Sequence, residues 1–160
     1  MTGYDAAQIC TNGHTINRST RMMPNLNKDH CTKCGQATVT ACAACAAPIQ
    51  GAYYSDGRTS LSTKLSIAPA YCHACGKPYP WTALAIQALS DLLECVAGLS
   101  ADERRQAIAF VPDLQSETPR THFAVVKWKL LVGKAKAEIA AGLQKALIDL
   151  AVDSVKKLLW

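Results

Sequence analysis

Seven cysteines and one histidine of this chain fall into four close pairs. Three pairs have the spacing Cys-x-x-Cys, and the first has Cys-x-x-x-His. In order, they are Cys10 with His14, Cys31 with Cys34, Cys42 with Cys45, and Cys72 with Cys75. A short gap lets both ligands of one tight turn reach a single ion, at about 2.3 Å for sulfur, and two such turns complete a tetrahedron. The spacing therefore predicts two structural zinc ions.

The order of the pairs suggests how they share the ions. We expect site 1 to consist of Cys10, His14, Cys31 and Cys34, and site 2 of Cys42, Cys45, Cys72 and Cys75. The alternative is the cross-brace of RING-type domains, which joins the first pair to the third and the second to the fourth. Seven residues separate Cys34 from Cys42, which is long for a cross-brace. Sequential pairing is therefore favoured.

Two of these predictions have alternatives: the metal at site 2 and the nitrogen ligand at site 1. Cys-x-x-Cys-Gly turns also build rubredoxin-type iron sites, so iron is an alternative at the all-cysteine site 2. At site 1, imidazole favours zinc. His30, beside Cys31, is an alternative to His14, but this choice leaves the first ligand pair incomplete. We therefore expect zinc at both sites and His14 as the nitrogen ligand.

Two halves of different composition must carry these sites. Cysteine, glycine and turn residues fill positions 1–80, whereas leucine, alanine and helical spacing dominate 81–160. Pro78 and Pro80 forbid a continuing helix at the boundary. The expected fold class is α+β, with a β-rich double zinc ribbon over 1–80 and three to four helices over 81–160. Within the ribbon, residues 49–54 and 63–67 are predicted strands around a turn.

The helical half contains clear start and stop signals. Apolar residues recur at three- and four-residue steps over 86–96, and Gly98 is placed to stop that helix. Ser100 and Glu103 form a capping box, which predicts a short helix that ends before Pro112.

The last predicted helix is long. Thr118 followed by Pro119 predicts its start, and helical spacing continues to residue 160. An unbroken helix of this length is too long to be buried by a small neighbour. We therefore expect a break, with Gly133 and Gly142 as the candidate positions, or a partner.

The charge and the apolar pattern limit the function classes. The formal net charge is +5, and seven thiolates with two divalent ions reduce it to about +2. A net charge this small does not indicate an electrostatic field strong enough to attract nucleic acid. No apolar run reaches the roughly 18–20 residues that cross a bilayer, and the first residues do not resemble a signal peptide. We expect a reducing cytoplasm, where cysteine pairs are more often metal ligands than disulfides.

An active site is not indicated. Catalytic zinc keeps one position for water, whereas each predicted ion has four protein ligands. The chain has no Gly-rich phosphate loop, no His-Glu-x-x-His and no deaminase-type combination of His-x-Glu with Pro-Cys-x-x-Cys. Cys95, the eighth cysteine, is expected to be a small buried residue. We expect a protein without enzymatic activity.

The run Ala70-Tyr71-Cys72-His73-Ala74-Cys75-Gly76-Lys77-Pro78-Tyr79-Pro80-Trp81-Thr82 resembles a family of uncharacterised bacterial proteins. Similar stretches are Cys10-Thr11-Asn12-Gly13-His14, Cys31-Thr32-Lys33-Cys34-Gly35 and Thr118-Pro119-Arg120-Thr121. The resemblance covers nearly the whole chain. It implies a metal-ribbon architecture and a bacterial origin, but no activity, because the family is a domain of unknown function. One departure is the run 42–45, which lacks the expected proline and glycine, so we expect a slightly looser site 2.

The first functional hypothesis is a non-enzymatic zinc-binding adaptor that binds a protein partner or associates with itself. Closed metal sites and an apolar helical half motivate it. The candidate interaction residues are Tyr53, Tyr54, Tyr79 and Trp81, since exposed aromatic residues carry much interface energy. The alternative is that these aromatic side chains pack on the zinc turns.

Two further hypotheses concern other partners. The first is a zinc-ribbon nucleic-acid-binding protein, with basic residues of the ribbon on phosphates and Tyr53 or Tyr54 stacked on bases. The second is association with a membrane surface through the last helix, which is rich in lysine and carries Trp128 and Trp160. An ordinary packed helix explains the same composition and is favoured. No small-molecule substrate is expected.

Overall fold

The structure is a computed structural model that describes residues 2–55, 58–59, 68–134, 137–150 and 155–157. Of residues 58–59, 137–138 and 149–150 it describes only the backbone. The chain separates into two compact units, Met1–Ala83 and Leu84–Trp160. Strands and one short 3₁₀ helix, η1 (Pro24–Leu26), occupy the first unit, and α-helices the second, apart from the start of the first α-helix. The α+β fold class is therefore confirmed.

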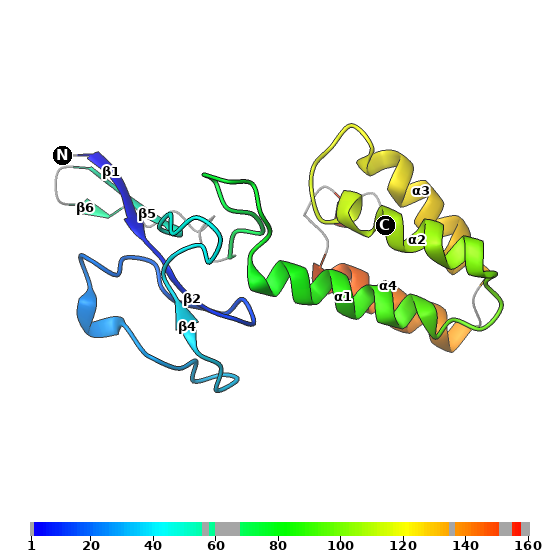
Figure 1. The fold of residues 1–160 in the computed structure, drawn as a ribbon, viewed down its shortest axis with the longest axis horizontal. Coiled ribbons are helices and arrows are strands. Elements are labelled where there is room, and N and C mark those ends of the chain that lie inside the picture. The colour runs from blue at the N-terminus through cyan, green and yellow to red at the C-terminus, as the bar shows by residue number, and fades with distance from the viewer. Residues whose placement is uncertain (1, 56–57, 60–67, 135–136, 151–154, 158–160) are drawn as a thin grey trace. The chain divides into compact units, whose positions relative to one another are not determined.

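Two small antiparallel sheets form the first unit (Figure 1). One has the order β1 (Thr2–Ala6), β5 (Gln50–Ser55) and β6 (Arg58–Thr59), and the other has the order β3 (Thr15–Asn17), β2 (Gln8–Cys10) and β4 (Thr38–Val39). β1 and β2 follow each other directly, so one segment of chain belongs to both sheets. The predicted strand at 49–54 is β5, and the predicted strand at 63–67 lies outside the described residues.

Buried polar side chains fix the loop that follows β3. The carboxylate of Asp5 accepts the backbone N–H groups of Arg21 and Met22 at 3.2 and 3.1 Å. The side chain of Gln8 donates to the carbonyl of Lys28 at 2.9 Å and accepts its N–H at 3.0 Å. Buried polar groups need such partners. These bonds therefore tie the loop before the second ligand pair to β1 and β2.

Four named helices and a further helical turn at 155–157 make up the described part of the helical half. The helices are α1 (Pro80–Glu94), α2 (Ala101–Leu114), α3 (Thr121–Val132) and α4 (Ala137–Leu150). One apolar core includes Leu89 and Leu93 of α1, Val111 and Leu114 of α2, Val125 and Trp128 of α3, and Leu143 and Leu147 of α4. Among the described residues, no helix is long and apolar enough to cross a membrane.

The start of α2 is as predicted, but its end is not. The N–H of Glu103 donates to Ser100 Oγ at 3.2 Å, and the N–H of Ser100 donates to the Glu103 carboxylate at 2.9 Å, which confirms the capping box. The predicted end before Pro112 is wrong, because α2 continues to Leu114. Val111 and Leu114 are fully buried on either side of the proline. Their packing outweighs the one helical hydrogen bond that proline removes.

The start of α3 also differs from the prediction. Thr118 and Pro119 precede the helix, which begins at Thr121. The hydroxyl of Thr118 accepts the N–H of Arg120 at 3.1 Å, and the hydroxyl of Thr121 accepts the N–H of Thr118 at 2.8 Å. Threonine side chains stabilise turns as readily as helix starts. Here they hold a turn just before the helix.

The predicted break between the last helices lies at Gly133. α3 ends at Val132 and α4 begins at Ala137, whereas Gly142 lies within α4 without breaking it. The break brings Lys134 to the start of α2, where its Nζ forms an ion pair with the carboxylate of Glu103. This hydrogen bond from Lys134, together with the capping bonds, lowers the pKa of Glu103 to about 2.

We predict that Lys134→Ala raises the pKa of Glu103 toward its ordinary value of 4.5. A folded-state pKa below the unfolded value stabilises the fold above about pH 4.5, and this stabilisation is lost as the pH falls toward about 2. An NMR titration of the Glu103 carboxyl carbon measures the change. Lys129→Ala is the matched control, because this exposed lysine has no carboxylate partner among the described residues. An equal pKa in both variants would contradict the prediction.

Candidate metal centres

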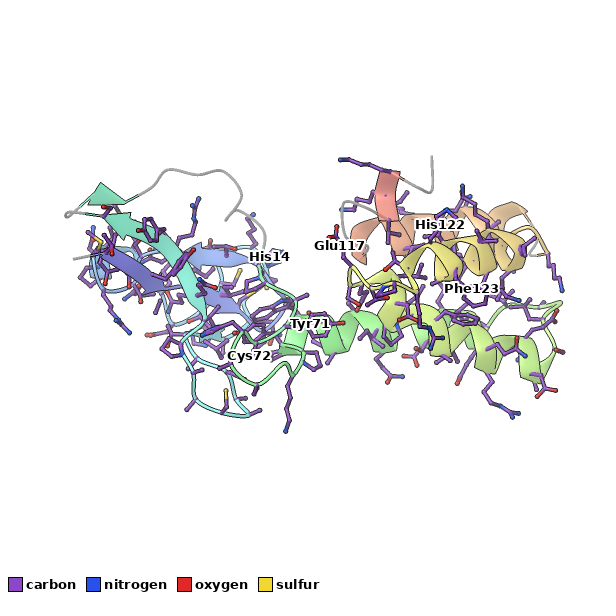
Figure 2. All side chains as sticks on the ribbon, turned by 90° about the horizontal axis from the view of Figure 1, so that it is seen from above. His14, Tyr71, Cys72, Glu117, His122 and Phe123 are labelled. Atoms are coloured by element: carbon purple, nitrogen blue, oxygen red, sulfur yellow. The ribbon has the colours of Figure 1, made fainter. Side chains whose placement is uncertain are left out.

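The structure brings the eight predicted ligands together in two groups of four. One group is Cys10, His14, Cys31 and Cys34, and the other is Cys42, Cys45, Cys72 and Cys75. In each group the ligand atoms all lie within 4.8 Å of one another. This is the sequential arrangement, and the cross-brace alternative is not formed. His14 and Cys72 mark the two groups in Figure 2.

The distances within each group match a tetrahedron around one ion. Cys10 Sγ lies 3.8 Å from Cys34 Sγ, and in site 2 two sulfur–sulfur distances are 3.8 and 3.7 Å. Sulfurs at about 2.3 Å from a tetrahedral zinc ion stand about 3.8 Å apart. His14 Nδ1 lies 3.5 Å from the sulfurs of Cys10 and Cys31, close to the about 3.6 Å that Zn–N and Zn–S bonds require. Both groups therefore fit zinc.

Three of the four turns share one backbone conformation. The N–H of the first cysteine donates to the carbonyl five residues later, and the N–H four residues later donates back to the cysteine carbonyl, at 2.8–2.9 Å. The residue after the second cysteine has φ of +73° at Gly35, +60° at Ala46 and +70° at Gly76. Glycine adopts this left-handed conformation freely, whereas an alanine resists it. Ala46, directly after Cys45, therefore holds a conformation in site 2 that a glycine would adopt more freely.

The first turn is one residue longer and uses different contacts. The N–H of His14 donates to Cys10 Sγ at 3.3 Å, and Gly13 has a φ of +85°. A Cβ added at Gly13 would lie 3.0 Å from Cβ of Trp81. The glycine thus allows the side chain of Trp81 to lie directly against this turn.

Tyr79 and Trp81 support the metal sites from behind the ligands. Tyr79 is 2% exposed, so its interpretation as an exposed interaction residue is wrong. Its burial and its hydrogen bond to the sulfur of Cys72 raise the pKa of its hydroxyl. The ring stacks on Trp81 with centroids 4.8 Å apart, and the indole Nε1–H donates to the carbonyl of Pro69 at 2.8 Å. The alternative that these aromatic residues pack on the zinc turns therefore holds for this pair.

The other two candidate interaction residues lie on β5. Tyr53 is 39% exposed, and its ring meets that of Tyr4 on β1 edge to face, with centroids 5.3 Å apart. Tyr54 is half-buried, with its hydroxyl beside Gly3. Of the four aromatic residues, Tyr53 is the one that the structure exposes.

The pKa values of the cysteine thiols show why each ligand group needs a cation. Burial opposes ionisation of Cys31, but the N–H groups of Lys33 and Cys34 favour its thiolate and lower its pKa to about 6. In site 2, N–H groups in the turn lower the pKa of Cys72 to about 6 in the same way. The N–H of Ala47 favours ionisation of Cys45, yet the neighbouring sulfurs raise the pKa of Cys45 to about 12. Several thiolates at this separation require a metal cation between them.

The other two candidate ligands considered, His30 and Cys95, belong to neither ligand group. His30 is exposed, forms an isolated β-bridge with Ala37 and does not replace His14. Cys95 is exposed, so its predicted burial is wrong. α1 ends at Glu94, and the cysteine falls in the turn that follows rather than on the buried face of the helix.

A comparison with protein families tests the resemblance seen in the sequence. Residues 3–159 match the family described as "Uncharacterized protein conserved in bacteria (DUF2321)". The chain belongs to this family. No curated protein and no solved structure matches the chain. Membership in the DUF2321 family confirms the predicted resemblance and carries no activity with it.

We predict two zinc ions per chain, measured by native mass spectrometry with elemental analysis. Cys72→Ser should lose one ion and Cys31→Ser the other, because each removes one of four ligands from a different group. Cys95→Ser should keep both. A single ion in the wild-type protein, or iron in site 2, would contradict the prediction.

We also predict that Ala46→Gly strengthens zinc binding at site 2. The left-handed conformation costs an alanine about 1 kcal/mol relative to glycine, which corresponds to about a fivefold change in affinity. Gly76→Ala should weaken the same site by a similar factor, since nothing lies within 4 Å of the added Cβ. Competition with a chromogenic chelator measures both, with Ala44→Gly as the control in the same turn. Equal affinities for Ala46→Gly and the wild-type protein would count against the strain argument.

Proposed function

We propose that the chain is a non-enzymatic zinc-binding adaptor, whose metal ions hold a surface in shape for a protein partner. The observation that carries this proposal is the composition of the ligand groups. Each contains four protein donors within bonding range of one ion. A tetrahedral zinc with four protein ligands has no position for a water or a substrate. Both ions are then structural.

The use of the aromatic residues supports the same function. Tyr79 and Trp81 pack behind the turns and stiffen both groups. The exposed pair of Tyr4 and Tyr53 lies on the sheet formed by β1 and β5. Aromatic residues on rigid strands present large contact areas with little loss of conformational entropy on binding.

A cross-linking experiment in bacterial cells tests the proposal. The wild-type chain and Cys95→Ser should cross-link to the same protein, identified by mass spectrometry. Cys72→Ser should lose that cross-link, because an incomplete site 2 releases its turns. Cys95 is the matched control, since it is exposed and belongs to neither ligand group.

Other outcomes would replace the proposal. Recovery of nucleic acid instead of protein, with salt-dependent binding of the purified chain, would favour the nucleic-acid alternative. Flotation with anionic vesicles would favour the membrane alternative. Cross-links that persist in Cys72→Ser would show that the partner does not depend on the zinc-bound surface.

A further inference from the structure

α2 and α3 border a pocket that none of the preceding sites uses. It has a volume of about 250 Å³. Its apolar lining includes Phe110 of α2 and Trp128 and Leu130 of α3. The charged residues of the lining are Glu103, Lys127 and Lys134. A pocket of this kind between two helices accepts large apolar side chains of a binding segment.

The surface beside the pocket is apolar. On α3, Phe123, Val126 and Leu130 are 50%, 45% and 62% exposed. Their spacing of three and four residues places them on one face of the helix. The ring of Phe123, labelled in Figure 2, meets that of Phe110 of α2 edge to face, with centroids 5.6 Å apart. The pocket and this stripe therefore form one apolar groove along α2 and α3.

One residue of the pocket lining carries a buried donor without a partner among the described residues. Trp128 lines the pocket and is 3% exposed. Its Nε1–H has no hydrogen-bond partner within the described part of the chain. An unsatisfied buried donor costs free energy, which makes this part of the lining polar as well as apolar.

The charge that stays unpaired in the pocket lining is positive. Lys127 is the charged residue of α3 that lines the pocket, and no aspartate or glutamate occurs in Thr121–Val132. Lys134 is neutralised by Glu103. The ammonium of Lys127 lies 5.6 Å from the ring centre of Phe123 and, among the described residues, has no carboxylate partner. A complementary ligand is therefore acidic as well as apolar.

We propose that this groove binds an acidic amphipathic helix of a partner protein. The inference rests on the proposed adaptor function and names one of its binding surfaces. A second copy of the chain is a poorer occupant, because pairing α3 with itself sets lysine against lysine. A membrane surface is also a poorer fit, since a flat bilayer surface presents no side chain that fills the pocket between α2 and α3.

Fluorescence anisotropy with the zinc-loaded full-length chain tests the groove. The probes are a panel of labelled helical peptides with Leu, Phe or Trp anchors at positions i, i+3 and i+7, and glutamate on the flanks. Each has a counterpart with lysine in place of glutamate. The best acidic peptides should bind at least about tenfold more tightly than their basic counterparts.

Matched variants locate the binding. Lys127→Glu and Leu130→Ala should each weaken the acidic peptides about tenfold or more. The controls are Lys129→Glu, on the same helix but outside the pocket lining, and Leu84→Ala, a 55% exposed leucine of α1. All four positions are exposed, so the fold should persist, as circular dichroism verifies.

Several results would overturn the inference. Acidic peptides that bind no more tightly than basic ones, or equal effects of Leu130→Ala and Leu84→Ala, would remove the groove as the site. A dimer abolished by Leu130→Ala would make a second copy the occupant, and flotation with phosphatidylglycerol vesicles abolished by Lys127→Glu would make it a membrane. If peptide binding fails while zinc-dependent cross-linking persists, the adaptor function stands without this surface.

Discussion

Mutual repulsion between closely spaced sulfurs is the constraint on which the first unit depends. Each ligand group packs its donors within 4.8 Å, and such a group ionises fully only around a cation. The strands, of two to six residues, are too short to hold the unit together by themselves. Its buried cluster is small and includes two of the ligands, Cys42 and Cys72. Two of the candidate metal ligands are therefore also part of the buried core in this part of the chain.

The segment Tyr79–Trp81 connects this buried cluster to the start of α1. Tyr79 reaches the sulfur of Cys72, and Trp81 lies against the turn of the first group. Pro80, between them, is the first residue of the helix, where its fixed φ suits helical geometry and its missing N–H leaves no bond unmade. Of these three consecutive residues, Tyr79 and Trp81 therefore contact one ligand group each, and Pro80 begins the helix.

The ligand sets were predictable because they depend on local chemistry. Spacing and turn residues place two donors on one side of a tight turn, and the order of the pairs suggests which turns meet. The burial of Tyr79 has a weaker signal in the sequence, a short repeat. The runs 42–48 and 72–78 both have the form Cys-x-x-Cys-x-x-Pro. The residue after each run, Ile49 or Tyr79, is buried. That repeat predicts an inward position after each turn.

The helix ends were harder to predict because tertiary packing decides them. Pro112 stays within α2 since the buried residues on either side of it gain more from the core than one hydrogen bond is worth. Thr118 had two local roles available, cap or turn, and the sequence does not distinguish them. Cys95 follows an apolar run but falls just past the last turn of α1, and element boundaries are the least certain feature of a sequence pattern.

The two ligand groups follow one another along the chain without interleaving. The first is complete when residue 34 has been added, and the second needs only residues 42–75. A growing polypeptide can therefore capture its first ion before the ligands of the second have left the ribosome. β1, however, pairs with β5 at residues 50–55. Its partner strand is therefore synthesised only after the first ligand pair of the second group. The ligands of the first group can thus all be present before β1 gains its partner strand, and an ion bound there would be the first fixed point of this unit.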